Sequence, residues 1–210
     1  GQELKMTGEV GTSLFGVSMT SGDWNADGKT DLAVGANGYS TNTGRAYIFY
    51  SDGHLAAAAT NADVIITGET TNNYFAISLT SGDFNADGKT DLAVGAYGYS
   101  TDTGRAYLFY NDGSLPATAV TADVIITGEA SSSFGILLTS GDWNADGKTD
   151  LAVGANAYST NTGRAYLFYN GSIITENASG ADIIITGETT DNLVGSSFFS
   201  GDIDAADKID

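Results

Sequence analysis

One run of oxygen-bearing side chains occurs three times in this sequence with the same spacing. In the first copy, residues 23–31, Asp, Asn, Asp and Asp stand at positions 1, 3, 5 and 9, and Gly28 stands at position 6. Ca²⁺ takes six to eight oxygen ligands, and a short loop can provide them when alternate side chains point inward and the backbone turns sharply at a glycine. We therefore predict a Ca²⁺ site in each copy, with the backbone carbonyl of the Lys at position 7 as a further ligand. The predicted ligands are Asp23, Asn25, Asp27, Lys29 and Asp31; Asp83, Asn85, Asp87, Lys89 and Asp91; and Asp142, Asn144, Asp146, Lys148 and Asp150.

A fourth, degraded copy of this loop follows near the end of the sequence. It keeps Asp202, Asp204 and Asp210, but Ala206 and Asp207 stand at positions 5 and 6. A position that needs a positive φ is costlier for Asp than for Gly. We therefore predict three bound Ca²⁺ ions and a fourth site that is weak or empty.

The charge of the chain agrees with cation binding, although turn chemistry offers another explanation of the loops. Asn, Asp and Gly dominate hairpin turns for backbone reasons alone, but three identical spacings of four oxygen side chains favour a metal. The formal net charge is −18, from 26 acidic and 8 basic residues. Such an excess strains a compact fold by self-repulsion and disfavours nucleic acid or an anionic membrane as a partner. We expect folding to depend on Ca²⁺ and a chelator to lower the melting temperature.

The loop belongs to a longer repeat, which determines the predicted fold. The string around it begins at Ser21, Ser81 and Ser140, and in degraded form at Ser200, a period of about 60 residues. Within one period, short runs rich in β-branched and aromatic residues alternate with Gly, Asn, Asp, Ser and Thr, a pattern typical of strands. In the second period we expect four antiparallel strands, at residues 75–84, 91–96, 105–110 and 123–129.

Such four-stranded sheets must stack face to face to bury their apolar surfaces, as propeller blades do. A parallel β-helix is the main alternative, but its coils are usually shorter. We predict an all-β fold of β-propeller blades, with three full blades and partial flanking strands. We assign one repeat domain to residues 1–210, with repeats at about 9–68, 69–128 and 129–187 and a partial repeat at 188–210.

Each period resembles an FG-GAP repeat of the integrin α-subunit propeller. Phe15-Gly16 and Phe134-Gly135 match the FG pair, and the Gly-Ala that ends the strand after each loop matches the GA of GAP. Phe75-Ala76 and Val194-Gly195 depart from FG, and the third position of GAP is Asn37, Tyr97 and Asn156 instead of Pro. The resemblance covers nearly the whole chain, and its Ca²⁺ loop is the specific part. It implies that residues 75–84 form an innermost strand, that 123–129 form an outermost strand, and that the protein is extracellular or on the cell surface. Propellers usually close with 4 to 8 blades, so the chain is expected to be a fragment or to complete a ring with other chains.

A second recurring segment joins the second and third strands of each repeat. On the architecture implied by the resemblance, it faces away from the Ca²⁺ loops, on the side where integrins meet ligands. Aromatic rings with amides suit sugars or protein loops, although the same residues are good turn formers and the Tyr rings could pack between blades. The predicted ligand rim comprises Tyr39, Asn42, Tyr99, Asp102, Tyr158 and Asn161.

Three Arg residues, Arg45, Arg105 and Arg164, follow the rim at regular spacing. They could form a row of anion-binding groups, but we favour a bracing role through fork-like hydrogen bonds.

Catalysis finds little support in the residue types. The chain has one His, His54, and no Cys, so neither a nucleophile–base pair nor an imidazole metal centre can be assembled. We predict a non-enzymatic Ca²⁺-binding module for adhesion, scaffolding or protein–protein assembly, including self-assembly. A Ca²⁺-dependent carbohydrate-binding propeller is the alternative. No apolar run of 18 residues occurs and no signal peptide is present in this chain, so we expect no membrane insertion.

Overall fold

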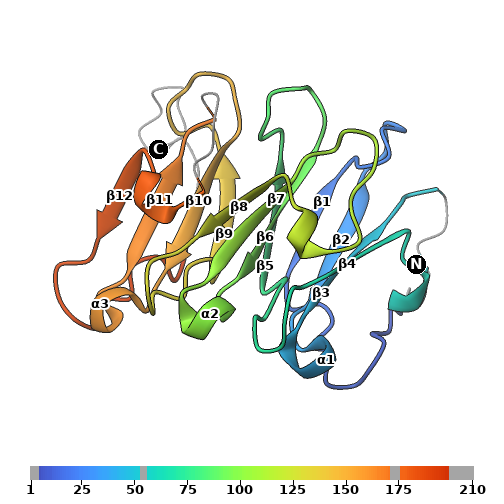
Figure 1. The fold of residues 1–210 in the computed structure, drawn as a ribbon. Helices are drawn as coiled ribbons and strands as arrows, with labels where there is room; N and C mark the ends of the chain where they lie inside the picture. Colours follow the sequence, from blue (N-terminus) through green and yellow to red (C-terminus); the bar gives the residue numbers. More distant parts are fainter. Residues whose placement is uncertain (1–4, 53–55, 171–175, 199–210) are drawn as a thin grey trace.

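The computed structural model describes residues 5–52, 56–170 and 176–198 and contains three four-stranded antiparallel sheets (Figure 1). The first sheet consists of β1 (Met19–Gly22), β2 (Asp31–Ala36), β3 (Arg45–Phe49) and β4 (Val64–Thr67). The second consists of β5 (Ser78–Gly82), β6 (Asp91–Ala96), β7 (Arg105–Phe109) and β8 (Val124–Thr127). The third consists of β9 (Leu137–Gly141), β10 (Asp150–Ala155), β11 (Arg164–Phe168) and β12 (Ile183–Thr186).

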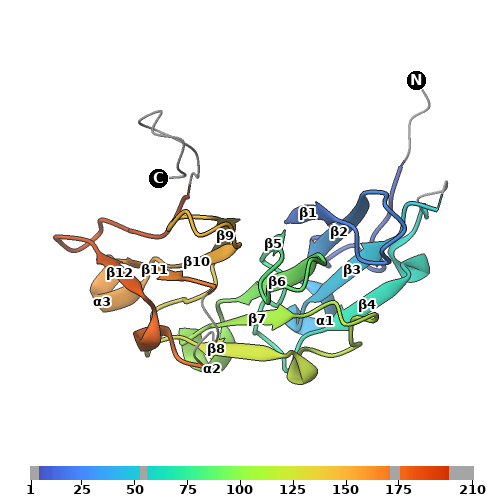
Figure 2. The same ribbon diagram turned by 90° about the horizontal axis from the view of Figure 1, so that it is seen from above.

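The sheets are consecutive blades that stand face to face. Strand order follows chain order in every sheet, and the register repeats: Leu32 pairs with Phe49, and Leu92 with Phe109. Seen from above, β1, β5 and β9 lie next to one another and the sheets fan out toward β4, β8 and β12 (Figure 2). The prediction of all-β propeller blades is thus confirmed. Each predicted Ca²⁺ loop joins the first and second strands of its blade.

The innermost strands are shorter than the sequence suggests. We expected a strand to begin at Phe75, but β5 begins at Ser78. Tyr74 and Ala76 have φ values of +54° and +65°, which no β-strand tolerates. The Ala76 N–H instead donates to the Gly95 carbonyl at 3.0 Å. This kink turns Phe75 inward, where it is fully buried.

Short turns occupy the segments that we expected to be loops. They are labelled α1 (Tyr39–Asn42), α2 (Tyr99–Asp102) and α3 (Tyr158–Asn161), and three 3₁₀ turns lie at Ala59–Asn61, Ala119–Thr121 and Ala178–Gly180. In α1, Ser40, Thr41 and Asn42 have φ values of +48°, +56° and +59°. Consecutive left-handed residues are costly, and the neighbouring blade offsets this cost: the Asn72 and Tyr74 N–H groups donate to the Thr41 and Asn42 carbonyls.

The apolar core lies between blades as well as within them. Phe75, which precedes the second blade, packs edge-on against Tyr107 and Phe109, with ring centroids 5.4 and 6.4 Å apart. The same cluster includes Ile66 of the first blade. Ile66 is fully buried, whereas Ile185, which takes its place in β12, is 51% exposed. The burial of these outer-strand side chains therefore depends on a following blade.

Candidate metal-binding loops and the opposite rim

Each carboxylate loop is folded by hydrogen bonds from its own backbone to its own side chains. In the first loop, the Asp27 N–H donates to both Asp23 Oδ1 (3.1 Å) and Asn25 Oδ1 (3.0 Å). The Gly28 N–H donates to Asp23 Oδ2 at 2.9 Å, and the Lys29 N–H donates to Asp27 Oδ1 at 2.9 Å. Because one N–H serves two side chains, the oxygens at positions 1 and 3 lie close together.

The second and third loops repeat this pattern. The Asp87 N–H donates to Asp83 and Asn85 at 3.0 Å each, and the Asp146 N–H donates to Asp142 and Asn144 at 3.0 Å each. The glycine at position 6 has a positive φ in all three, as the sequence indicates, but so does the alanine at position 4: Ala26, Ala86 and Ala145 have φ values of +57°, +60° and +58°. Nothing in the residue types signals this second left-handed residue.

The Asp at position 9 has a different environment from the other three. Asp31 is 1% exposed. Its Oδ2 accepts the Trp24 N–H at 2.9 Å, and its Oδ1 accepts the Ser51 N–H at 2.8 Å. Each carboxylate oxygen can accept a second bond, so these contacts fix the carboxylate without exhausting it. Asp91 and Asp150 are held in the same way by the equivalent residues.

The electrostatics of the second loop favour a neutralising partner. Burial raises the pKa of Asp91 to about 6; hydrogen bonds from the N–H groups of Asn111 and Phe84 oppose this rise, and the charges of Asp87 and Asp83 add to it. Burial likewise raises the pKa of Asp150. A carboxylate that is buried beside other carboxylates is costly to ionise unless a cation balances it.

Two of the Lys side chains at position 7 are only partly exposed to solvent. The Lys29 side chain is 57% exposed, yet its Nζ lies 3.2 Å from Asp27 Oδ2. Lys89 Nζ lies 3.9 Å from Asp87 Oδ2. The surplus of loop carboxylates attracts these two ammonium groups back toward their own loops, although such exposed pairs contribute little stability.

The donor set of each loop fits a hard cation. Every candidate ligand is a carboxylate, amide or carbonyl oxygen, the chemistry that Ca²⁺ prefers. The fit concerns the type and spacing of the donors. In the described parts of the chain, no three Asp, Glu, His or Cys side chains converge into a ready-made metal cluster. The weak fourth set, Asp202, Asp204 and Asp210, lies outside the described residues, as does His54.

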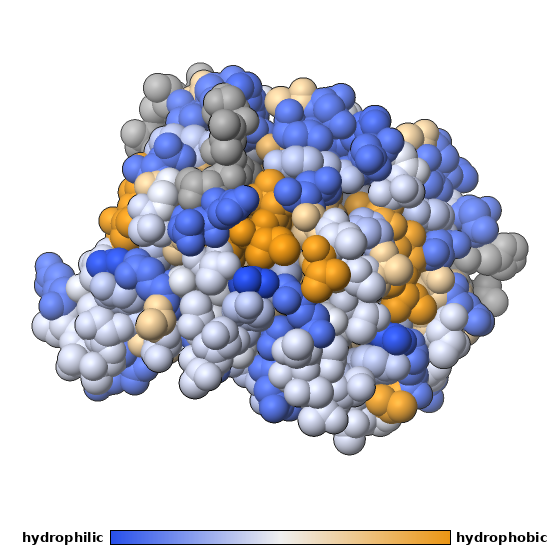
Figure 3. Space-filling view, viewed as in Figure 1, coloured by the Kyte–Doolittle hydropathy of each residue, from blue (hydrophilic) through white to orange (hydrophobic). Residues whose placement is uncertain are grey.

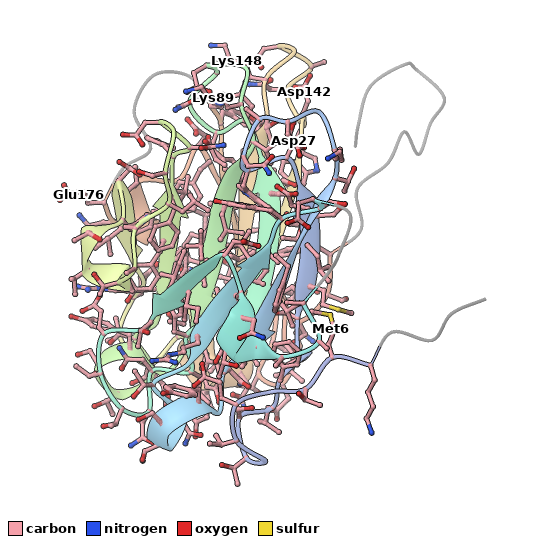
Figure 4. The ribbon with its side chains drawn as sticks, turned by 90° about the vertical axis from the view of Figure 1, so that its right-hand side faces the viewer. Met6, Asp27, Lys89, Asp142, Lys148 and Glu176 are labelled. Carbon is pink, nitrogen blue, oxygen red and sulfur yellow. The ribbon has the colours of Figure 1, made fainter. Side chains whose placement is uncertain are left out.

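The three loops share one end of the molecule. Figure 4 shows Asp27, Lys89, Asp142 and Lys148 at the same end, where the first and second strands of each blade meet. The space-filling view is mostly hydrophilic at this end, with apolar patches across the middle of the face (Figure 3).

The predicted ligand rim lies at the opposite end, and its Tyr rings contact Arg side chains. The guanidinium carbon of Arg45 lies 3.8 Å from the centre of the Tyr39 ring. Arg105 stacks on Tyr99 at 3.6 Å, and Arg164 on Tyr158 at 3.7 Å. One face of each half-buried ring is therefore covered by an Arg of the same blade.

The amide side chains of the rim join neighbouring segments. Asn42 Nδ2 donates to Asn72 Oδ1 at 3.2 Å and to the Tyr74 hydroxyl at 3.1 Å, and Asn161 Nδ2 donates to Asp191 Oδ1 at 3.2 Å. Asp102 is exposed. The rim thus combines structural contacts with exposed polar groups, and its role in ligand binding stays a prediction.

The same Arg residues form an ionic latch that the sequence analysis missed. Arg45 Nη1 donates to Glu9 Oε1 at 2.7 Å, and the Tyr47 hydroxyl donates to the same oxygen at 3.1 Å. The equivalent latches join Arg105 and Arg164 to Glu69 and Glu129 at 2.7 and 2.6 Å. Burial and the nearby Glu raise the pKa of Tyr47 and Tyr107. The bracing role of Arg is therefore borne out, and the repeated Thr-Gly-Glu before each blade was the available signal.

Comparison with known proteins agrees with this geometry. The family model described as FG-GAP repeat matches residues 15–49, 75–109 and 134–168. Over 195 residues the chain is 30% identical to phosphatidylinositol-glycan-specific phospholipase D of Bos taurus, covering 83% of this chain and 23% of that protein. It is 33% identical over 183 residues to integrin alpha-PS2 of Drosophila melanogaster (82% and 12%) and 30% identical over 165 residues to integrin alpha-5 of Xenopus laevis (71% and 15%).

Fold and site together define a class: tandem four-stranded propeller blades with a carboxylate loop in each. The three family-model matches span half of the chain, one in each blade. The chain therefore belongs to the FG-GAP repeat family. It spans less than a quarter of the length of these curated relatives. In the described ranges, no helix is both long and apolar enough to cross a bilayer.

Proposed function

We propose that the chain is a Ca²⁺-binding FG-GAP module of an extracellular or cell-surface protein, which acts in adhesion, scaffolding or protein–protein assembly. The observation that carries the proposal is the threefold identity of the loops. The same N–H groups hold the same oxygens in each of them, within about 0.1 Å. Turn chemistry alone requires neither four oxygen side chains nor a buried carboxylate at position 9 in every copy.

Within each loop, we assign the ion to the side chains at positions 1, 3, 5 and 9 and to the carbonyl at position 7. Each loop has three Asp and one Lys, a formal charge of −2, so one Ca²⁺ neutralises it. The ion would then hold the hairpin between the first two strands of each blade. Since a loop without a helix pair has nothing to open, the role of the metal is to rigidify the blade.

The partner is proposed to be a protein. Integrin α subunits occur repeatedly among the relatives, and the end opposite the loops carries exposed polar groups beside the stacked Tyr–Arg pairs. The carbohydrate-binding alternative needs open aromatic faces for stacking, and the Arg side chains cover one face of each rim Tyr. A glycan array decides between them, because a lectin would give saturable binding to a defined sugar in Ca²⁺ but not in EDTA.

The proposal includes no catalytic role. One set of relatives is named as a phospholipase, but the chain matches less than a quarter of that protein. The described carboxylates that repeat in every blade are engaged by backbone N–H groups or by Arg, whereas a catalytic residue is expected once per protein.

Calorimetric titration of chelator-stripped protein with Ca²⁺ tests the metal assignment. We expect three ions, and one fewer in each of Asp27→Ala, Asp87→Ala and Asp146→Ala. Asp102→Ala, which removes an exposed carboxylate at the opposite end, is the matched control and should keep all three. An absence of binding, or a stoichiometry that no loop substitution changes, would refute the proposal.

Light scattering after size exclusion, in Ca²⁺ and in EDTA, tests self-assembly as the form of partnership. A multimer that requires Ca²⁺ supports assembly between copies. A monomer in both conditions leaves a different protein as the partner.

A further inference from the structure

A single buried side chain connects the first two loops. The backbone N–H of Asn111 donates to Asp91 Oδ1 of the second loop at 2.8 Å. Its side-chain Nδ2 donates to the carbonyl of Trp24, in the first loop, at 3.0 Å. Asn111 is 2% exposed and Trp24 is also 2% exposed. Asn111 therefore contacts both a proposed ligand of the ion in the second loop and the backbone of the first loop.

The second and third loops are connected in the same manner. The N–H of Asn170 donates to Asp150 Oδ1 at 2.8 Å, and its Nδ2 donates to the Asp83 carbonyl at 2.9 Å. Asn170 is 6% exposed. Together the two Asn residues form a continuous chain of contacts through all three loops.

The first blade shows which part of this arrangement is local. There Ser51 takes the equivalent place, and its N–H donates to Asp31 Oδ1 at 2.8 Å. The backbone bond thus occurs in all three blades, whether or not the side chain is an amide. The hydrogen bond from the Asn side chain is additional to it. This bond occurs in the second and third blades, and in each it reaches the loop of the preceding blade.

We propose that Asn111 and Asn170 are positioning residues that make Ca²⁺ binding at the three loops cooperative. This inference rests on the proposed Ca²⁺ sites. An ion in the first loop fixes the backbone of that loop, including the Trp24 carbonyl. The fixed carbonyl anchors Asn111, whose N–H in turn holds the carboxylate of Asp91 in place for the second ion. Once the first ion has ordered its loop, the second loop loses less conformational entropy when it binds its own ion. The coupling is reciprocal.

Charge opposes this coupling. Each loop has a formal charge of −2 and becomes neutral when one Ca²⁺ binds. A filled loop therefore no longer attracts the Ca²⁺ of its neighbour, as an empty loop does, and charge alone would make the sites anticooperative. The hydrogen-bonded link has to outweigh this term, which salt screens.

The two Trp residues of the protein allow Ca²⁺ binding at the first and at the third loop to be measured separately. Trp24 lies in the first loop and Trp143 in the third, while the second has Phe84 at this position. In a Trp143→Phe background, Trp24 fluorescence reports Ca²⁺ binding to the first loop alone. In that background, Asp87→Ala removes the ion of the second loop. We expect it to weaken binding at the first loop by about fivefold or more, the lower end of typical allosteric couplings.

The deciding step is to repeat this comparison in Asn111→Ser, which copies the residue found naturally at Ser51. The same Asp87→Ala substitution should then change the first-loop affinity by less than about twofold, since the coupling energy has been removed. Asn170→Ser is the matched control and should leave the fivefold effect intact. The mirror experiment uses Trp24→Phe, reads the third loop through Trp143, and exchanges the roles of Asn170 and Asn111, so it decides the question if Asn111→Ser fails to fold.

The outcomes separate the two proposals. If calorimetry finds no bound Ca²⁺, the proposed function fails and this inference fails with it. If three ions bind but Asp87→Ala leaves the first loop unaffected, only the cooperativity is overturned. If the fivefold effect persists in Asn111→Ser, the coupling does not pass through Asn111, and the assignment is wrong.

Discussion

The two ends of the blades both concentrate charged side chains, but they balance those charges in different ways. At the turn end, each Glu of the latch meets an Arg at 2.6–2.7 Å and a Tyr hydroxyl at 2.8–3.1 Å. At the loop end, each loop has three carboxylates and one Lys, and Lys29 and Lys89 lie 3.2 and 3.9 Å from an Asp of their own loop.

This difference shows at which end the charges are balanced by groups of the protein itself. The latch satisfies a partly buried carboxylate with groups of the same chain, so it needs no ligand. The loops satisfy their oxygens with backbone N–H groups but leave their net charge uncompensated. Removing the cation should therefore damage one end and leave the other intact, and four predictions test this contrast.

The largest expected effect is that of metal removal. At a Ca²⁺ concentration of 100 times Kd, each ion stabilises the fold by about 2.7 kcal/mol. For a chain of this size, three ions correspond to a fall of roughly 15 °C or more in melting temperature when EDTA replaces Ca²⁺. Circular dichroism melts in the two buffers measure it. Identical melting curves would show that the loops are turns only.

Two glycines with the same backbone conformation distinguish the packing of the two ends. Gly104 at the turn end and Gly88 at the loop end have φ values of +78° and +84°. A Cβ on Gly104 would collide with the backbone of Phe134, whereas a Cβ on Gly88 would meet no atom within 4 Å. We expect Gly104→Ala to cost about 2–5 kcal/mol, from strain plus overpacking, and Gly88→Ala about 1–2 kcal/mol, from strain alone. Denaturant unfolding in Ca²⁺ measures both, and equal costs would contradict the contrast.

Neutralising one carboxylate at each end should change stability with the same sign in Ca²⁺ but with opposite signs in EDTA. Glu69→Gln leaves the guanidinium of Arg105 without its counter-charge, so it should lower stability by about 1–3 kcal/mol in Ca²⁺ and in EDTA alike. Asp87→Asn should lower the melting temperature in Ca²⁺, because the ion loses a ligand charge. In EDTA it should raise it, because repulsion among the loop carboxylates falls. A destabilising Asp87→Asn in both buffers would mean that the loop carries no uncompensated charge.

The smallest effect is expected from the Lys of the loop. Lys89 is 43% exposed and lies 3.9 Å from Asp87, so Lys89→Met should change stability in Ca²⁺ by no more than about 0.5 kcal/mol. Arg105→Met, the matched change at the turn end, should cost several times more. Unfolding curves of the two variants in the same buffer provide the comparison.

Local sequence patterns were sufficient to predict the strands and the loops. The alternation of apolar runs and turn residues indicates four strands per repeat, because side chains alternate between the faces of a strand within a few residues. The loop follows from spacing alone, because positions 1, 3, 5 and 6 contact one another through bonds two to five residues apart. The start of the inner strand was misplaced by three residues, since nothing in Phe75-Ala76 signals a positive φ.

The repeat therefore predicted the four-stranded blades and the candidate ligands, which depend on contacts within one period. Tertiary structure decided the contacts that cross from one blade to the next. Glu69, which follows the last strand of the first blade, meets Arg105 of the second blade 36 residues away, and Asn111 meets Trp24 87 residues away. Such pairs depend on how two sheets stack. The residue pattern of a single strand or loop does not predict that stacking. The physical reason is that local hydrogen bonds fix the shape of each blade, whereas burial and charge pairing between blades fix their arrangement.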